Sequence, residues 1–169
     1  MKDMLISIQP PHTTDIFDCK KKIEWRTKQL PTGKHYVYET KKCFGLGEVI
    51  GEFHIWRIKR YESVDMIPEN HIELGCVPIE FLEAYSKGKP LYAHFIIDPK
   101  RYDKPVPLRR FHKPCPYKLP DGSRMDVPCP CGKYTHNFDE ESGLIYCTRR
   151  MERPPQSWCY VEEVKNADT

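Results

Sequence analysis

The sequence contains no apolar run approaching the length of about eighteen residues that a membrane-spanning helix needs. Its first residues lead directly into an alternating segment, without the pattern of a signal peptide. It also has no internal repeat, no glycine-rich phosphate-binding loop and no recognisable Ser-His-Asp set. These absences argue against a membrane protein, a P-loop nucleotidase and a triad hydrolase. We therefore expect a cytoplasmic chain with no membrane partner.

A large excess of charge of one sign is also missing, because 27 basic and 24 acidic residues leave a net charge of only +3. Such a balance does not by itself indicate a nucleic-acid-binding protein, so the distribution of the charges matters more than their sum. The basic residues gather in three groups: Lys20, Lys21, Lys22 and Arg26; Lys41, Lys42, Arg57, Lys59 and Arg60; Arg109, Arg110, Lys113, Arg149, Arg150 and Arg153. Aromatic residues are interleaved with these groups. Cations attract phosphates and aromatic rings stack on bases, so the mixture suits RNA, although such residues are common on any protein surface.

The hydrophobic pattern predicts a mainly β fold of the α+β class, with two or three short helices. A chain of 169 residues forms one domain or one domain with an insertion, and 16 prolines disfavour long helices. We expect strands at 4–9, 22–27, 35–39, 45–61, 91–97 and 159–164, and helices at 15–20 and 78–86. The predicted division is a β-rich core at 1–113 plus 151–165, a cysteine-rich insertion at 114–150 and a polar tail at 166–169.

Four of the eight cysteines fall in the insertion, which has many prolines and little periodic hydrophobic pattern. Such a segment cannot bury much apolar surface by itself, and zinc bound by four loop residues is the simplest means of holding it. The predicted ligands of this structural zinc ion are Cys115, Cys129, Cys131 and Cys147, with His136 and His112 as alternatives to Cys115. The competing interpretation is four unrelated reduced thiols.

The strand expected at 22–27 carries an unusual row of ionisable residues. Lys22, Glu24 and Arg26 are two residues apart and share one face, while Ile23 and Trp25 share the other. The apolar face can enter a core while the charged face lines a cleft. The alternative is a solvated edge strand with alternating charges.

Several motifs together resemble ASCH domains, which are small members of the PUA-like β-barrel superfamily. The first are Ser-Ile-Gln-Pro-Pro at 7–11, a short helix, Lys-Lys-x-x-Glu-x-Arg at 20–26 and the following Pro31. Segments at 45–53, 78–86, 91–97, 98–111 and 153–161 follow in the order expected for the family. The resemblance covers most of the chain except 114–150. It implies a mixed β-barrel that recognises RNA or modified bases.

On this resemblance and the strand periodicity, we expect a cleft that binds RNA, a nucleotide or a modified nucleoside. The residues assigned to it are Lys21, Lys22, Glu24, Arg26, Trp56, Arg153 and Trp158. The two tryptophans are the candidate platforms on which a base could stack.

The resemblance also implies an alternative, because some small ASCH proteins are amidohydrolases that deacetylate N4-acetylcytidine. Their proposed machinery is a Lys and a Thr three residues apart and a Glu just before a helix. Here Lys21 matches the Lys, Glu24 replaces the Thr, and Gly75 falls at the Glu position with Glu73 nearby. Lys21 and Glu24 would be the catalytic pair if the chain is an enzyme, which its sequence leaves open. A third hypothesis is a zinc-containing protein-interaction module.

Overall fold

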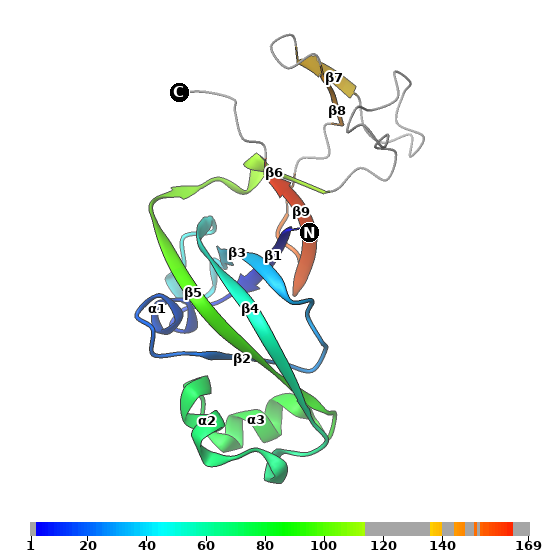
Figure 1. Ribbon diagram of the computed structural model, residues 1–169. Coiled ribbons are helices and arrows are strands. Elements are labelled where there is room, and N and C mark those ends of the chain that lie inside the picture. Colours follow the sequence, from blue (N-terminus) through cyan, green and yellow to red (C-terminus); the bar gives the residue numbers. More distant parts are fainter. Residues whose placement is uncertain (1–2, 114–135, 140–143, 148–150, 152, 164–169) are drawn as a thin grey trace.

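The computed structural model describes residues 3–113, 136–139, 144–147, 151 and 153–163 (Figure 1). One sheet among these residues has seven strands in the order β2-β5-β4-β3-β1-β9-β6. The strands are β1 (Asp3–Ile8), β2 (Ile23–Arg26), β3 (Gly33–Glu39), β4 (Val49–Tyr61), β5 (Leu91–Val106), β6 (Phe111–His112) and β9 (Trp158–Glu163). The β1–β3 pair is parallel and the other pairs are antiparallel, so the sheet is mixed.

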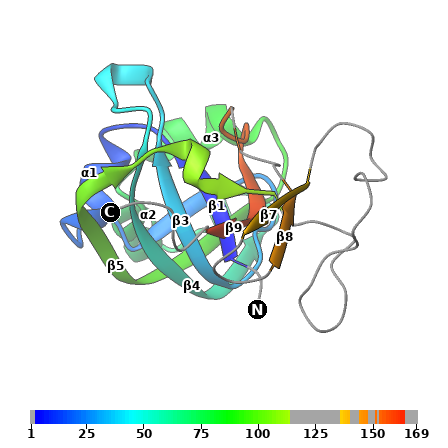
Figure 2. The same cartoon turned by 90° about the horizontal axis from the view of Figure 1, so that it is seen from above.

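Figure 2, in which the molecule is seen from above, shows that the sheet curls strongly. Among the described strands, however, β2 and β6 are the two edges and no ladder joins them. The prediction of a mainly β, α+β fold with a mixed sheet and few helices is therefore confirmed. The closed barrel that was expected is instead an open sheet in the part of the chain described here.

The helices are short and lie at the ends of the sheet. They are α1 (His12–Phe17), α2 (Glu69–Gly75) and α3 (Ile79–Ser86), with single turns of 3-10 helix at Lys42–Phe44, Val64–Met66 and Leu108–Arg110. Helix α1 begins three residues before the helix expected at 15–20. The hydroxyl of Thr13 does not cap it but donates to the buried carboxylate of Glu39, at 2.7 Å.

Strands β4 and β5 are long, and irregularities bend them. The register between them shifts at Val49/Gly51 and at Glu52/His54. Gly51 is required at the first shift, because a Cβ there would lie 2.4 Å from the carbonyl oxygen of Lys100. Strand β5 runs nine residues past the predicted end at Ile97, and Asp98 adopts a φ of 51°. A bulge at this point accommodates Pro99, which cannot donate to a ladder.

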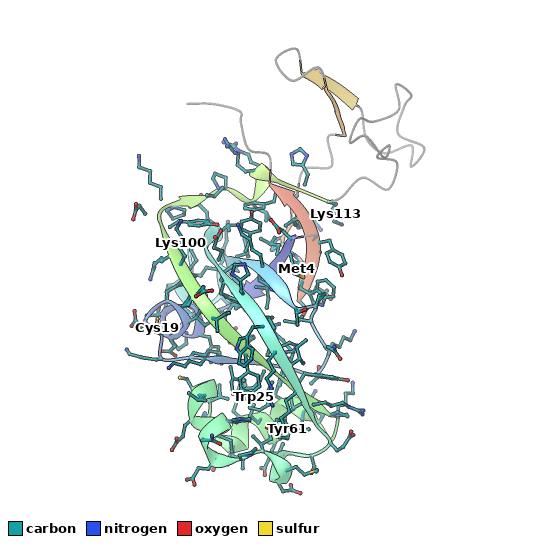
Figure 3. The ribbon with its side chains drawn as sticks, viewed as in Figure 1. Met4, Cys19, Trp25, Tyr61, Lys100 and Lys113 are labelled. Carbon is teal, nitrogen blue, oxygen red and sulfur yellow. The ribbon has the colours of Figure 1, made fainter. Side chains whose placement is uncertain are left out.

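Two clusters of apolar side chains lie on opposite faces of the β2–β5–β4 part of the sheet. The inner cluster contains Ile6, Ile8, Ile16, Leu30, Val37, Ile50, Phe53, Ile55 and Ile96. The outer cluster contains Ile23, Trp25, Tyr61, Val64, Ile67, Val77, Leu82, Leu91 and Ala93. Figure 3 shows Trp25 and Tyr61 close together above α2 and α3, and their ring centroids are 6.0 Å apart. The prediction that Ile23 and Trp25 enter a core is confirmed.

The insertion is represented by one hairpin, β7 (His136–Asp139) and β8 (Leu144–Cys147), whose strands pair with each other. His136 and Cys147 are directly opposite in its register. Three of the predicted zinc ligands, Cys115, Cys129 and Cys131, lie outside the described residues. Across the ranges that the structure does describe, no helix is long and apolar enough to cross a membrane.

Candidate functional site

Glu24 lies at the centre of a buried group of charges on β2. Its side chain is 9% exposed, and Lys21 beside it is 2% exposed. Arg26 donates from Nε to Oε1 of Glu24 at 2.9 Å, and its Nη2 lies 2.9 Å from the same oxygen as part of the ion pair. Lys21 Nζ lies 3.6 Å from Oε2, within ion-pair range but beyond a hydrogen bond. These three residues are called the β2 cluster below.

Of the two lysines assigned to the site, Lys21 joins the β2 cluster and Lys22 does not. Strand β2 begins only at Ile23, and the residues before it do not follow its alternation. Lys22 is exposed, while its amide donates to the carbonyl of Leu74 at 2.8 Å. The ammonium of Lys21 turns inward and donates to the carbonyl of Gly75, at the end of α2, at 2.5 Å. The cluster thus combines the i, i+2 spacing of a strand with an i, i+3 contact from the turn before it.

Arg26 connects the cluster to the far side of the curled sheet. Its Nη2 donates to the carbonyl of Ser7 on β1 at 2.9 Å, and its Nη1 is 3.5 Å from Oγ of Ser157. Ser7 in turn receives support from the segment before β9, because its amide donates to Ser157 and its hydroxyl donates to Pro155. Most of the guanidinium's donors are therefore used within the protein, and Arg26 chiefly positions Glu24.

Two histidines that the sequence did not single out also belong to this region. His94 is fully buried, accepts at Nε2 from the amide of Leu30 at 2.9 Å, and bonds through Nδ1 to the carbonyl of Glu24 at 3.1 Å. These contacts assign the proton to Nδ1 and fix the backbone of Glu24. His12, at the start of α1, is half-buried, and its buried Nδ1 has no partner in the described part of the protein. His94 sits in an ordinary alternating strand, which gave no signal for it.

The charges in the region keep Glu24 ionised. Burial alone would raise the pKa of Glu24, but the nearby Arg26 and then Lys21 lower it, and the net shift is downward. The pKa of His12 is lowered, first by burial and then by the positive charge of Lys21, with Glu24 opposing. His12 is therefore neutral at pH 7 beside an ionised carboxylate. The arrangement offers an anionic acceptor, a cationic donor and a neutral imidazole.

Position 75 cannot carry the carboxylate that the resemblance places there. A Cβ on Gly75 would lie 2.1 Å from Nε1 of Trp25, so the indole occupies the space that a side chain would need. The neighbouring Glu73 is exposed and does not join the cluster. Glu24 is thus the carboxylate that accompanies Lys21 in this protein.

The structure separates Trp56 from the β2 cluster. Glu24 is opposite His94 in the β2–β5 ladder, whereas Phe95, which packs edge-on to Trp56, is opposite Ile23. Because neighbouring residues of a strand point to opposite faces, Glu24 and Phe95 lie on opposite faces of the sheet. Trp56 is 55% exposed on the outer one.

The two remaining predicted site residues come from the segment around β9. Trp158 is half-buried, packs against the inner apolar cluster and meets Tyr160 edge-on at 5.2 Å. It directly follows Ser157, which contacts Arg26. Arg153 is exposed. Of these two residues, Trp158 is the one that the structure connects to the region of the β2 cluster.

The predicted metal centre is not tested by the structure. Within the described ranges, no three His, Cys, Asp or Glu side chains are grouped so that they could hold a metal ion. His112, an alternative ligand, lies on β6 opposite Glu162. The zinc site of the insertion therefore stays a prediction.

Comparison with known proteins identifies the fold through structure rather than sequence. No protein-family model matches the chain, and no curated protein matches its sequence. The crystal structure of ASCH from Zymomonas mobilis matches with a TM-score of 0.55 and 22% identity, covering 63% of this chain and 74% of that chain. A point mutant of the same protein matches with a TM-score of 0.56 and 20% identity, covering 64% and 77%. The chain therefore has the fold of an ASCH domain, as the sequence motifs led us to expect.

Proposed function

We propose that this chain binds RNA through a single nucleotide unit held at the β2 cluster. The observation that carries the proposal is a pair of hydrogen-bonding atoms on two residues whose charges interact, Glu24 and His12. In the described residues no hydrogen bond reaches Oε2 of Glu24 or Nδ1 of His12. The buried Nδ1 of His12 is costly to leave without a partner, so a ligand or water at this place would satisfy it.

The chemistry of these atoms suits the hydrogen-bonding edge of a base. The ionised Oε2 of Glu24 accepts a bond from an exocyclic amine, as acidic side chains do with cytosine. Lys21 has used one donor on Gly75, and its remaining donors can reach a base carbonyl or a ring nitrogen. Trp158 would stack on the base, and Arg153 would contact the phosphate.

The proposal is tested by calorimetric titration with a panel of nucleosides and mononucleotides. His12→Ala removes an unpartnered imidazole from a half-exposed position, so we expect it to fold while losing affinity. Glu24→Gln keeps the shape of the side chain but offers an amide in place of an anionic acceptor, and should change the preferred base. Phe81→Ala, which changes an exposed aromatic side chain on α3, is the control. If the parent binds no member of the panel, or if both variants bind as it does, the site assignment is wrong.

Hydrolysis of the N-acetyl amide bond of a modified nucleoside such as N4-acetylcytidine, which would release acetate and leave the exocyclic amine on the base, is the second candidate. It is favoured by one contact, the 3.6 Å approach of the buried Lys21 ammonium to a carboxylate that can orient it. Chromatography of N4-acetylcytidine incubated with the parent and with Lys21→Ala separates the two functions. Turnover that is lost in the variant would make the chain an amidohydrolase, whereas binding without turnover supports the recognition module.

The insertion at 114–150 carries the remaining proposal, a zinc-stapled segment that could also dock a protein. The opposition of His136 and Cys147 in the hairpin supports it, because cross-strand partners are close in space. If the insertion rather than the β2 cluster governs binding, affinity for the partner would show little dependence on salt, unlike binding to phosphates.

A further inference from the structure

A second exposed surface lies on the outer face of β4 and β5, away from the β2 cluster. It consists of Trp56, Arg57, Lys59 and Phe95, and is called the outer strip below. The register between β4 and β5 shifts between Ile55 and Arg57, which places both Trp56 and Arg57 beside Phe95. Bulges of this kind re-aim side chains. In Figure 1, α2 and α3 cover only one end of the two strands, and no helix lies in front of their middle.

The outer strip is built on a row of aromatic contacts. Trp56 meets Phe95 edge-on at 6.2 Å, and Phe95 meets His71 of α2 edge-on at 5.1 Å. His71 is in turn hydrogen-bonded through Nδ1 to the hydroxyl of Tyr61. Each ring thus packs against the next, and the row ends in an exposed indole.

Two cations complete the strip. The Arg57 guanidinium lies 5.4 Å from the centroid of Phe95, and the Lys59 ammonium lies 4.8 Å from that of Tyr61. Both side chains are exposed, and in the part of the chain that the structure describes neither forms an ion pair with a carboxylate. Their charges lower the pKa of the neighbouring His71, after the larger effect of burial. The two cations of the strip are therefore not neutralised by any carboxylate among the residues that the structure describes.

We infer that the outer strip binds a single-stranded nucleic acid, with one base stacked on Trp56 and adjacent phosphates held by Arg57 and Lys59. Uncompensated cations beside an exposed indole complement a polyanion with flat bases. A duplex keeps its bases stacked inside and offers none to the indole, so a single strand is the better partner. This inference rests on the proposed RNA-binding function and adds to it a second contact surface on the opposite face of the sheet.

The test is binding of a labelled oligouridylate of about twelve nucleotides, measured by fluorescence anisotropy at several salt concentrations. Trp56→Ala should raise the dissociation constant about tenfold or more, and Trp56→Phe should restore most of the affinity. The double variant Arg57→Gln/Lys59→Gln should reduce the slope of log K against log salt by about 1.4, because each lost phosphate contact to a single strand contributes about 0.7. A duplex of the same length should bind more weakly, and DNA and RNA strands are compared directly.

Matched controls come from α3 and the turn after it. Phe81 is an exposed aromatic residue, 48% exposed, and Lys87 and Lys89 are two exposed lysines. Phe81→Ala and Lys87→Gln/Lys89→Gln should bind as the parent does. The inference is overturned if Trp56→Ala binds within twofold of the parent, if the controls weaken binding equally, or if the parent does not bind the strand. The effects of His12→Ala and Glu24→Gln on mononucleotide binding report on the β2 cluster, and the effects of Trp56→Ala and Arg57→Gln/Lys59→Gln on strand binding report on the outer strip, so failure of the outer strip and failure of the proposed function are distinguishable.

Discussion

Arg26 donates a hydrogen bond of 2.9 Å from Nη2 to the backbone carbonyl of Ser7, although their strands do not pair. In the sheet order β2 and β1 are separated by β5, β4 and β3. The curl of the sheet therefore brings the edge strand β2 close to β1, which lies inside the strand order. The side chain of Arg26, and not a backbone ladder, connects the two strands. The β2 cluster lies at this junction, where Glu24 orients the guanidinium that spans it.

We expect Arg26→Lys to destabilise the fold by about 1–3 kcal/mol, because an ammonium cannot serve Glu24 and Ser7 through a planar fork. Urea denaturation measures the free energy of unfolding. Arg60→Lys is the matched control, since Arg60 pairs with Glu62 across the same i, i+2 spacing but both side chains are more than half exposed. It should cost less than about 0.5 kcal/mol. Equal losses in the two variants would show that Arg26 is not a structural link.

His35 should make the stability depend on pH below neutrality. Burial lowers the pKa of this histidine from 6.5 to about 4 in the folded chain, although its bond to the carbonyl of Gly33 opposes the shift. Between these values the unfolded chain binds a proton that the folded chain does not, so stability falls as the pH drops from 6.5 to 4. The loss from this residue is about 3 kcal/mol as an order of magnitude. His35→Phe should flatten the curve of unfolding free energy against pH over this range, and an unchanged slope would contradict the assignment.

Gly75→Ala should destabilise the protein by about 1–3 kcal/mol through overpacking against Trp25. The two positions are in contact, so their effects should not be additive. In a Trp25→Phe background, which removes the indole nitrogen, the same Gly75→Ala change should cost less. A double-mutant cycle by thermal or urea unfolding gives the coupling. Additive losses would mean that the indole does not limit position 75.

Metal analysis tests the predicted zinc ion. The purified chain should contain about one zinc per molecule, and Cys129→Ser should lose the metal and part of the stability. Cys19→Ser is the control, because Cys19 is exposed in the fold and far in sequence from the insertion. A metal-free chain whose stability is unaffected by Cys129→Ser would contradict the zinc prediction. The four cysteines of the insertion would then be ordinary reduced thiols.

Much of the β2 region could be predicted from the alternation of residues. The period of two correctly placed Ile23 and Trp25 in a core and Glu24 beside Arg26, since these residues belong to one regular strand. It failed at Lys22, because the strand starts one residue later and the turn before it directs Lys21 inward. Local periodicity carries no information about where a strand begins.

Contacts between distant segments were beyond the reach of the sequence. Trp56 was placed in the cleft because it is aromatic and near basic residues, but strand register puts it on the opposite face from Glu24. His94 forms hydrogen bonds with the carbonyl of Glu24 and the amide of Leu30. Bonds to the backbone of distant residues produce no recognisable sequence motif, so this role could not be predicted. Strand β5 is longer than predicted, because a bulge at Asp98 and Pro99 lets its pairing with β4 continue past Ile97.

The most direct test of the proposed nucleotide site is a nuclear magnetic resonance titration of the isotope-labelled chain with mononucleotides. The account predicts that the backbone amides of Lys21, Glu24 and Arg26 shift first, together with those of His12 and Gly75, while that of Trp56 does not move. Shifts confined to the outer face of β4 and β5, or none at any residue, would contradict it.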